Sequence, residues 1–146
     1  MITKEVLSSS LEDYLEAIFH IVAQKQAARG KDIAQRLGVN NSSVTGALRV
    51  LAEKGLINYA PYDIITLTAE GKRVAKNIIQ RHKALHDFFV KVLCVNGEIA
   101  DRAACNMEHA LPQEILSRLI QFLKFIERCP HCLDEFRQEQ TPRGDK

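Results

Sequence analysis

Residues 31–51 have the sequence KDIAQRLGVNNSSVTGALRVL, and their pattern indicates two helices separated by a turn. Ile33, Ala34 and Leu37 recur at helical spacing and predict a short helix over about residues 31–37. Gly38 follows, and glycine readily adopts the left-handed conformation that ends many helices. A second helix is expected from Asn41 or Ser42, and its buried side would be made by Val44, Ala47, Leu48 and Leu51. A helix, a tight glycine turn and a second helix form a helix-turn-helix, whose second helix reads DNA.

After Gly55 the helical spacing of the apolar residues ends and the pattern changes. Residues 56–59 and 64–68 predict two short strands, which are joined by a turn at residues 61–63. A hairpin in this position is the wing of a winged helix. Thr68 is expected to cap a long helix that runs to about Leu93.

Three more helices are predicted around this central region. The first covers residues 11–23 with Ser10 as its N-cap, and the other two cover residues 98–110 and 112–127. Their apolar surface is large for a short chain, which favours a homodimer. The expected fold class is therefore mainly α, with a winged helix-turn-helix DNA-binding domain at residues 1–71. An all-helical dimerisation and metal-binding domain with a polar C-terminal tail is expected at residues 72–146.

The composition is that of an ordinary globular protein, with 46% hydrophobic residues, 26% charged residues and a net charge of +2. Residues 24–54 hold six basic and two acidic side chains, and residues 55–83 hold five basic and two acidic ones. A basic middle between acidic ends indicates a module that meets phosphate, although solvated helix faces would give the same charges. Because no apolar run or signal-peptide pattern is found, we expect a cytoplasmic protein with no membrane partner.

The second helix and the wing carry the side chains that we expect to contact double-stranded DNA. Short hydroxyl and amide groups at a helix N-terminus suit phosphates and base edges, and arginine contacts phosphate or guanine. Asn41, Ser42 and Ser43 have an alternative interpretation, in which one of them caps the helix. The candidates are Arg36, Asn41, Ser42, Ser43, Thr45, Arg49, Tyr59 and Tyr62.

Cys105, Glu108 and His109 bring three potential metal ligands into five residues. At positions i, i+3 and i+4 of a helix, a thiolate, a carboxylate and an imidazole project from one face. Such a mixed set suits a divalent transition metal better than calcium or magnesium. Further ligand candidates elsewhere in the chain are Asp13, Glu16, His82 and His86. Each of these residues, taken singly, also fits a solvated or helix-capping role.

Several segments together resemble the diphtheria-toxin-repressor/manganese-transport-regulator family, over about residues 8–127. The segments are LEDYLEAI at 11–18, DIA-x-x-LGV at 32–39, SSVT at 42–45, LT-x-x-G at 67–71, RH at 81–82 and C-x-x-EH at 105–109. The resemblance implies a homodimeric winged-helix repressor of metal-homeostasis genes that binds operator DNA when it is loaded with Mn²⁺ or Fe²⁺. Zn²⁺, Co²⁺ and Ni²⁺ are expected to bind in vitro. The family's metal ligands fall on Asp13, Glu16, His82, Cys105, Glu108 and His109.

The resemblance also shows where this sequence departs from the family. Asp13 is typical of manganese-responsive members, whereas Cys105 is typical of the iron branch, so the two residues point to different metals. His82, His86 and Asp101 stand where the iron branch has a histidine, a glutamate and a histidine at its ancillary site. A second metal ion that involves His86 and Asp101 is therefore an open prediction. The chain is expected to lack the SH3-like third domain of longer members.

Cys129 and Cys132 form a Cys-x-x-Cys pair that these predictions do not use. The pair is interpreted as reduced thiols at a helix end, as part of a zinc or iron site, or as a redox sensor. Cys94, in an apolar stretch, is expected to be a small buried residue. Two rival functions remain: a winged-helix regulator that responds to thiol oxidation or an organic ligand, and a small metalloenzyme that uses Glu108 as a base.

Overall fold

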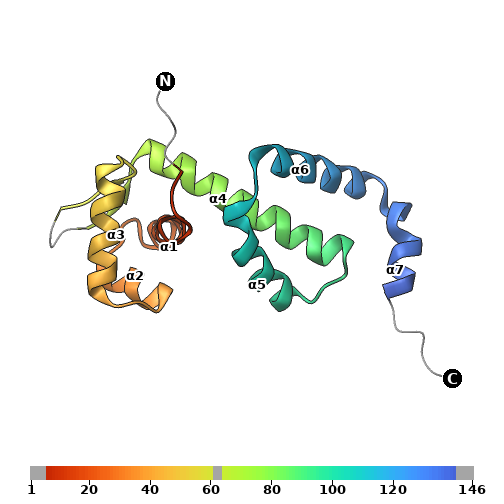
Figure 1. Ribbon diagram of the computed structural model, residues 1–146, viewed down its shortest axis with the longest axis horizontal. Coiled ribbons are helices and arrows are strands. Elements are labelled where there is room, and N and C mark those ends of the chain that lie inside the picture. The colour runs from red at the N-terminus through yellow and green to blue at the C-terminus, as the bar shows by residue number, and fades with distance from the viewer. Residues whose placement is uncertain (1–5, 61–63, 141–146) are drawn as a thin grey trace. The chain divides into compact units, whose positions relative to one another are not determined.

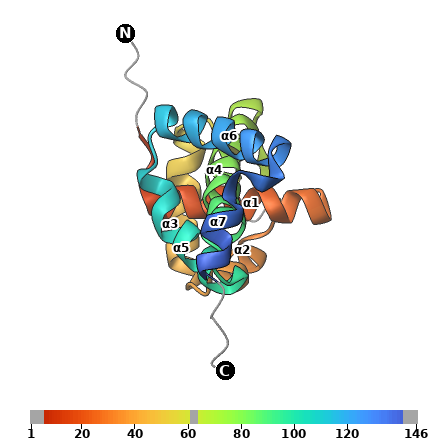
Figure 2. The same cartoon turned by 90° about the vertical axis from the view of Figure 1, so that its right-hand side faces the viewer.

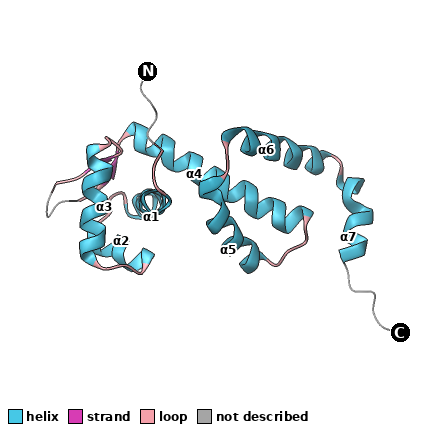
Figure 3. Ribbon diagram, viewed as in Figure 1, coloured by secondary structure: helices cyan, strands magenta, loops and turns pink. Residues whose placement is uncertain are grey.

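The computed structural model describes residues 6–60 and 64–140, and every structural statement below concerns those residues. They fall into two compact units that divide between Ile79 and Gln80, so helix α4 (Ala69–Asp87) begins in the first unit and ends in the second. Helices dominate both units, and the strands lie between α3 and α4 in the chain (Figure 3). The mainly α fold class is confirmed.

The first unit is built on three helices that pack against one another, namely α1 (Ser9–Lys25), α2 (Gly30–Leu37) and α3 (Asn41–Glu53) (Figures 1 and 2). The helix expected over residues 11–23 is confirmed as α1, but Ser10 is not its cap. Ser8 takes that role, because its Oγ accepts a hydrogen bond of 3.3 Å from the backbone N–H of Leu11.

The turn between α2 and α3 has the expected glycine geometry. Gly38 lies in the left-handed region with φ 66°, and α2 ends there. Asn40 is the N-cap of α3, since its Oδ1 accepts hydrogen bonds of 2.8 Å from the backbone N–H of Ser43 and from the hydroxyl of Ser42. The alternative that Asn41, Ser42 or Ser43 caps the helix is therefore wrong, because the residue before them already satisfies the free N–H.

The wing is a two-stranded antiparallel hairpin of β1 (Ile57–Asn58) and β2 (Thr66–Leu67), shorter than the predicted strands. Next to it, Ala28 and Ile65 exchange two backbone hydrogen bonds of 2.8 and 2.9 Å, which tie the wing to the chain before α2. The predicted turn at residues 61–63 lies outside the described residues.

The core of the first unit joins these elements through apolar side chains that are at most 2% exposed. Burying each such side chain contributes about 1.5–3 kcal/mol relative to leaving it in water. The buried side predicted for α3 is confirmed. The largest members of this core are Leu15, Ile18, Ile33, Val44, Leu48, Leu51, Ile65 and Ile78.

Helix α4 begins where it lies closest to the wing. The hydroxyl of Thr68 accepts a hydrogen bond of 3.0 Å from the N–H of Gly71 and donates one of 2.7 Å to the carbonyl of Gly55, so the predicted cap is confirmed. The N–H of Thr68 donates to the carbonyl of Leu56 at 3.1 Å. A Cβ added to Gly71 would lie 1.8 Å from that same carbonyl oxygen. Only glycine fits this close approach of α4 to the residue that precedes β1.

The second unit continues α4 with a π-helical turn, and the helices predicted near residues 98–110 and 112–127 are confirmed. A further helix, α7, forms in the tail that was expected to be only polar. The elements are η1 (Phe88–Val92), α5 (Gly97–Met107), η2 (Glu108–Ala110), α6 (Gln113–Arg128), η3 (Pro130–Leu133) and α7 (Asp134–Gln140).

The prediction of a buried Cys94 is wrong. The residue is exposed and takes the left-handed conformation with φ 56°, two positions after the π-helical turn ends at Val92. The apolar residues before it belong to the last turn of a helix, and Cys94 lies just beyond that turn.

Apolar side chains remain exposed on the helices of the second unit. Ile115, Phe122 and Phe125 of α6 are 53%, 37% and 49% exposed, and Ile99 of α5 is 52% exposed. Surface of this kind is what dimerisation buries. No helix among the described residues is both long enough and apolar enough to cross a membrane.

Candidate functional site

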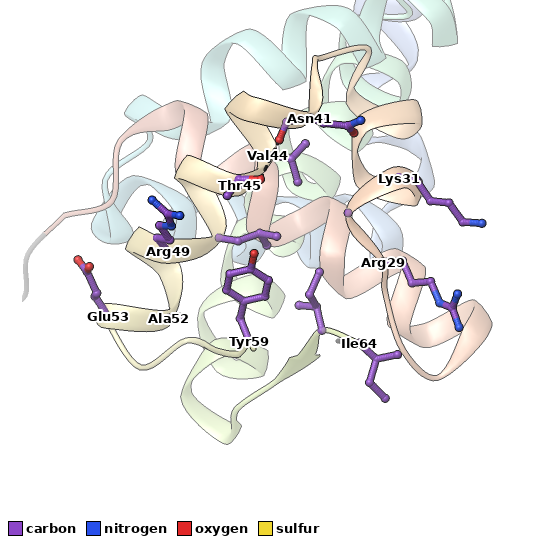
Figure 4. A pocket seen from close by; sticks show the side chains of 13 residues that line it. Arg29, Lys31, Asn41, Val44, Thr45, Arg49, Ala52, Glu53, Tyr59 and Ile64 are labelled. Atoms are coloured by element: carbon purple, nitrogen blue, oxygen red, sulfur yellow. Dashed lines mark hydrogen bonds between the residues drawn. The ribbon is translucent and has the colours of Figure 1, made fainter. Parts of the chain in front are cut away.

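A hollow of about 990 Å³ lies beside α3 in the first unit (Figure 4). Its floor is apolar and comprises side chains such as Val44, Leu48 and Ile65, while polar and basic groups surround it. Tyr59 from the wing lies near the middle of the view, with Arg49 to one side. The full lining is Arg29, Gly30, Lys31, Asn41, Val44, Thr45, Leu48, Arg49, Ala52, Glu53, Tyr59, Ile64 and Ile65.

Two of the basic side chains beside this hollow were not predicted as DNA contacts. Arg29 and Lys31 stand at the start of α2, are exposed and lie across the hollow from Arg49 (Figure 4). With Glu53 as the acidic member, the lining has three basic groups to one acidic group. The cluster of basic residues over positions 24–54 was visible in the sequence, but its distribution over two helices around one hollow was not.

The predicted DNA contacts divide into those in the hollow and those beside it. Asn41, Thr45, Arg49 and Tyr59 line it, and the hydroxyl of Thr45 donates a 3.0 Å hydrogen bond to the carbonyl of Asn41. Arg36, Ser42 and Ser43 are exposed but are not part of the lining. Tyr62 lies outside the described residues.

In the second unit, His82 is the centre of a cluster of potential metal ligands. It comes from the part of α4 in that unit, while Asp101 and Cys105 lie one turn apart on α5 and Glu108 begins η2. The sequence placed Cys105, Glu108 and His109 on one continuous helix. The helix instead tightens to a 3₁₀ turn at Glu108, and this turn carries the carboxylate and the imidazole of His109.

Both ring nitrogens of His82 are engaged within this cluster. Nδ1 lies 2.7 Å from Oε2 of Glu108 and 3.7 Å from Sγ of Cys105, and Nε2 lies 2.9 Å from Oδ1 of Asp101. Glu108 is only 1% exposed, and its second oxygen lies 3.7 Å from Nε2 of His109. The donor atoms of His82, Asp101 and Cys105 all lie within 4.8 Å of one another.

The charges around His82 favour its protonated form. The hydrogen bond with Glu108 raises the pKa of His82 to about 9, against the opposing effect of burial, and the hydrogen bond with Asp101 raises it further. The imidazolium then donates from both nitrogens to carboxylates. A divalent cation would also supply positive charge to these carboxylates, and binding it at His82 requires the imidazolium to release its proton.

His86 does not join this cluster. Its ring stacks beside that of His82 with centroids 6.4 Å apart, and its Nδ1 lies 3.8 Å from Oδ1 of Asp87. Asp101 contacts His82 instead. His86 and Asp101 thus contact different residues, Asp87 and His82 respectively, and the second metal site stays a prediction.

The remaining predicted ligands, Asp13 and Glu16, lie one turn apart on α1 in the first unit. Oε1 of Glu16 lies 3.5 Å from Nε2 of His20, one turn further along the helix. The contact between Glu16 and His20 is expected from their i, i+4 spacing, because such residues are neighbours on the helix surface.

The donor chemistry of the second unit fits a divalent transition metal. An imidazole, a thiol and carboxylates of which one is buried combine nitrogen, sulfur and oxygen ligands at close range. A buried carboxylate needs a compensating cation, and here an imidazolium provides one.

Cys129 and Cys132 are joined by a disulfide across η3, with their Cα atoms 5.5 Å apart. The interpretation as reduced thiols therefore does not describe this structure.

The sequence matches two family models in tandem. Residues 6–64 match the N-terminal DNA-binding domain of iron-dependent repressors, and residues 68–137 match the metal-binding and dimerisation domain of the same proteins. The chain belongs to the iron-dependent repressor family. Its members are transcriptional regulators, so the metalloenzyme interpretation is set aside.

Relatives within the iron-dependent repressor family match most of the chain. An uncharacterized HTH-type transcriptional regulator of Methanocaldococcus jannaschii is 38% identical over 119 residues, which are 81% of this chain and 95% of the relative. The transcriptional regulator MntR of Shouchella clausii is 30% identical over 131 residues, which are 90% and 91% of the two chains. A manganese-dependent transcriptional repressor, solved in complex with manganese, is 31% identical with a TM-score of 0.70. The match covers 79% of this chain and spans about half, 53%, of that solved chain.

Proposed function

We propose that this chain is a metal-activated repressor that binds double-stranded operator DNA as a homodimer and controls genes of manganese or iron homeostasis. It acts in the cytoplasm with Mn²⁺ or Fe²⁺ as its activating ion. The observation that carries the proposal is the cluster in which His82 contacts Glu108, Asp101 and Cys105 at close range. Residues 1–71 bind DNA, and residues 72–146 bind metal and dimerise.

The proposed ligand set follows the family resemblance. In the second unit it comprises His82, Cys105, Glu108 and His109, and from α1 it adds Asp13 and Glu16. The metal supplies positive charge to carboxylates that would otherwise repel one another, and it stabilises whichever arrangement of the ligands it binds best. DNA binding then depends on metal because the two binding events favour the same arrangement.

The proposed DNA contacts are built around α3. Its N-terminal residues meet the base edges and phosphates of the major groove, and Tyr59 lies against the backbone. Arg29, Lys31 and Arg49 surround the hollow and each neutralise phosphate charge. Arg29→Ala is expected to lower affinity for every sequence alike and to reduce the salt dependence by about one counterion. Lys76→Ala, at an exposed basic residue of α4, is the matched control.

The proposed function is tested by titrating the chelator-stripped protein into a labelled operator pool with Mn²⁺, anaerobic Fe²⁺ or Zn²⁺. We expect tight binding only with metal, and the preference between Mn²⁺ and Fe²⁺ reveals whether Asp13 or Cys105 dominates. Equal binding with and without metal would overturn the proposal.

The ligand assignment needs its own readout, and calorimetric titration of metal into the protein gives it without DNA. Cys105→Ala and Glu108→Gln are expected to weaken metal binding at least tenfold. Cys94→Ala, which changes an exposed cysteine outside the cluster, should bind metal as the parent does. Thermal unfolding of each variant distinguishes loss of ligands from loss of fold.

A further inference from the structure

The turn between α6 and α7 holds a feature that metal-dependent repression does not require. Cys129 ends α6, Cys132 lies three residues on in η3, and the two sulfurs are bonded. Their Cα separation of 5.5 Å is within the normal range for a disulfide. The other two cysteines of the chain, Cys94 and Cys105, form no disulfide.

The pair is open to reagents in solution. Cys132 and the two residues between the cysteines are exposed, and Cys129 is partly exposed. A disulfide that stabilises a core is normally shielded by it, whereas exposed pairs exchange with other thiols and disulfides. The pair encloses only two residues, so its effect as a cross-link is local.

The position of α7 depends on this local turn. None of the residues of α7 is buried, so hydrophobic packing holds the helix only weakly. Its described polar contacts run back to the turn and to the end of η1. Oδ2 of Asp134 lies 2.8 Å from Nδ1 of His131, and Arg137 donates hydrogen bonds to the carbonyls of Pro130 at 3.5 Å and Lys91 at 3.0 Å.

We propose that Cys129 and Cys132 form a reversible dithiol–disulfide switch that exchanges with low-molecular-weight disulfides and controls whether α7 is ordered. The thiolate of Cys132, the more exposed of the two, attacks a sulfur of the small disulfide, forms a mixed disulfide and releases one thiolate. The thiolate of Cys129 then attacks the Cys132 sulfur and releases the second. Two electrons pass from the protein thiols to the small disulfide, which leaves as two thiols with the two protons.

The first test equilibrates the intact protein in buffers of reduced and oxidised glutathione and counts its thiols by alkylation and intact mass. We expect Cys129 and Cys132, located by peptide mapping, to lose their thiols together in the parent and in Cys94→Ala, with no glutathione retained on either of the two residues. Cys129→Ser should instead keep glutathione on Cys132 as a stable mixed disulfide. A parent whose Cys129 and Cys132 stay reduced throughout, or that accumulates the mixed disulfide at Cys132, overturns the switch. A reduced pair that binds one Zn²⁺ per chain and resists oxidation also overturns it.

The second test measures amide hydrogen exchange of residues 134–140 in the oxidised and reduced parent. Exchange there is expected to be at least tenfold faster after reduction, whereas α1 is unchanged. Arg137→Ala should speed exchange of α7 even in the oxidised protein, because it removes the contact with the carbonyl of Lys91. Equal exchange in the oxidised and reduced parent refutes the control of α7. Since neither test uses DNA or an activating metal, failure here leaves the proposed repressor function standing.

Discussion

Replacing Gly71 by alanine is expected to destabilise the first unit severely, although alanine is the better helix former. The added Cβ would lie 1.8 Å from the carbonyl oxygen of Leu56, where a van der Waals contact needs roughly 3.5 Å. The start of α4 and the backbone at Leu56, just before β1, must therefore move apart by about 1.5 Å or more. That movement strains the hydrogen bonds that Thr68 makes to the carbonyls of Gly55 and Leu56.

The expected magnitude follows from three terms. Overpacking costs about 1–3 kcal/mol, and two weakened hydrogen bonds cost about 0.5–1.5 kcal/mol each. The higher helix propensity of alanine returns about 1 kcal/mol. We expect Gly71→Ala to lower the free energy of unfolding by about 3 kcal/mol.

Gly46 provides a matched control within the same unit. It lies in the interior of α3, is exposed, and would have no atom within 4 Å of an added Cβ. Gly46→Ala should therefore stabilise the protein by about 0.5–1 kcal/mol. Urea unfolding followed by circular dichroism, at one protein concentration and with chelator present, measures both. The reasoning is refuted if the two variants shift the midpoint in the same direction.

Three further predictions concern the rest of the molecule. In metal-free protein, Glu108 raises the pKa of His82 from 6.5 to about 9, which adds stability that is full below pH 6.5 and disappears as the pH rises through 9. The urea midpoint should therefore fall over that pH window in the parent but not in His82→Gln. Equal declines in the two proteins would contradict this prediction. Asn40→Ala removes the cap of α3 and should cost about 1 kcal/mol by urea unfolding, a result that a neutral variant would disprove. Leu116→Ala leaves a cavity under α6 and should cost about 2–5 kcal/mol in thermal unfolding, so an unchanged melting temperature would show that this packing is unimportant.

The elements that the sequence predicted correctly are those with a strong local signal. Gly38 and Thr68 sit where the apolar period stops, so the turn and the cap followed from position alone. Asn40 was missed because the next three residues also have side chains that cap helices. Helix α7 was missed because Phe136 is its only apolar residue and none of its residues is buried, which leaves no apolar period to detect.

The candidate sites were predicted only in part, because sequence spacing does not give distances between helices. The i, i+3 and i+4 pattern found Cys105 and Glu108, but only the fold brings both to Nδ1 of His82. The contact between Asp101 and His82 joins residues 19 positions apart and could not be read from either helix alone. The hollow flanked by Arg29 likewise depends on how α2 and the wing pack against α3.

The π-helical turn at Phe88–Val92 has a consequence for how this chain tolerates changes in length. Such a turn holds one more residue than an α-helical turn, so a single inserted codon is the smallest change that creates it. Deleting Val90 should therefore allow the end of α4 to close as ordinary α-helix, which far-ultraviolet circular dichroism and a retained melting temperature would reveal. Deleting one residue from the regular part of α4, such as Asn77, would instead rotate every later side chain of the helix by about 100°. If both outcomes are observed, the end of α4 tolerates a change of one residue in chain length and its regular part does not.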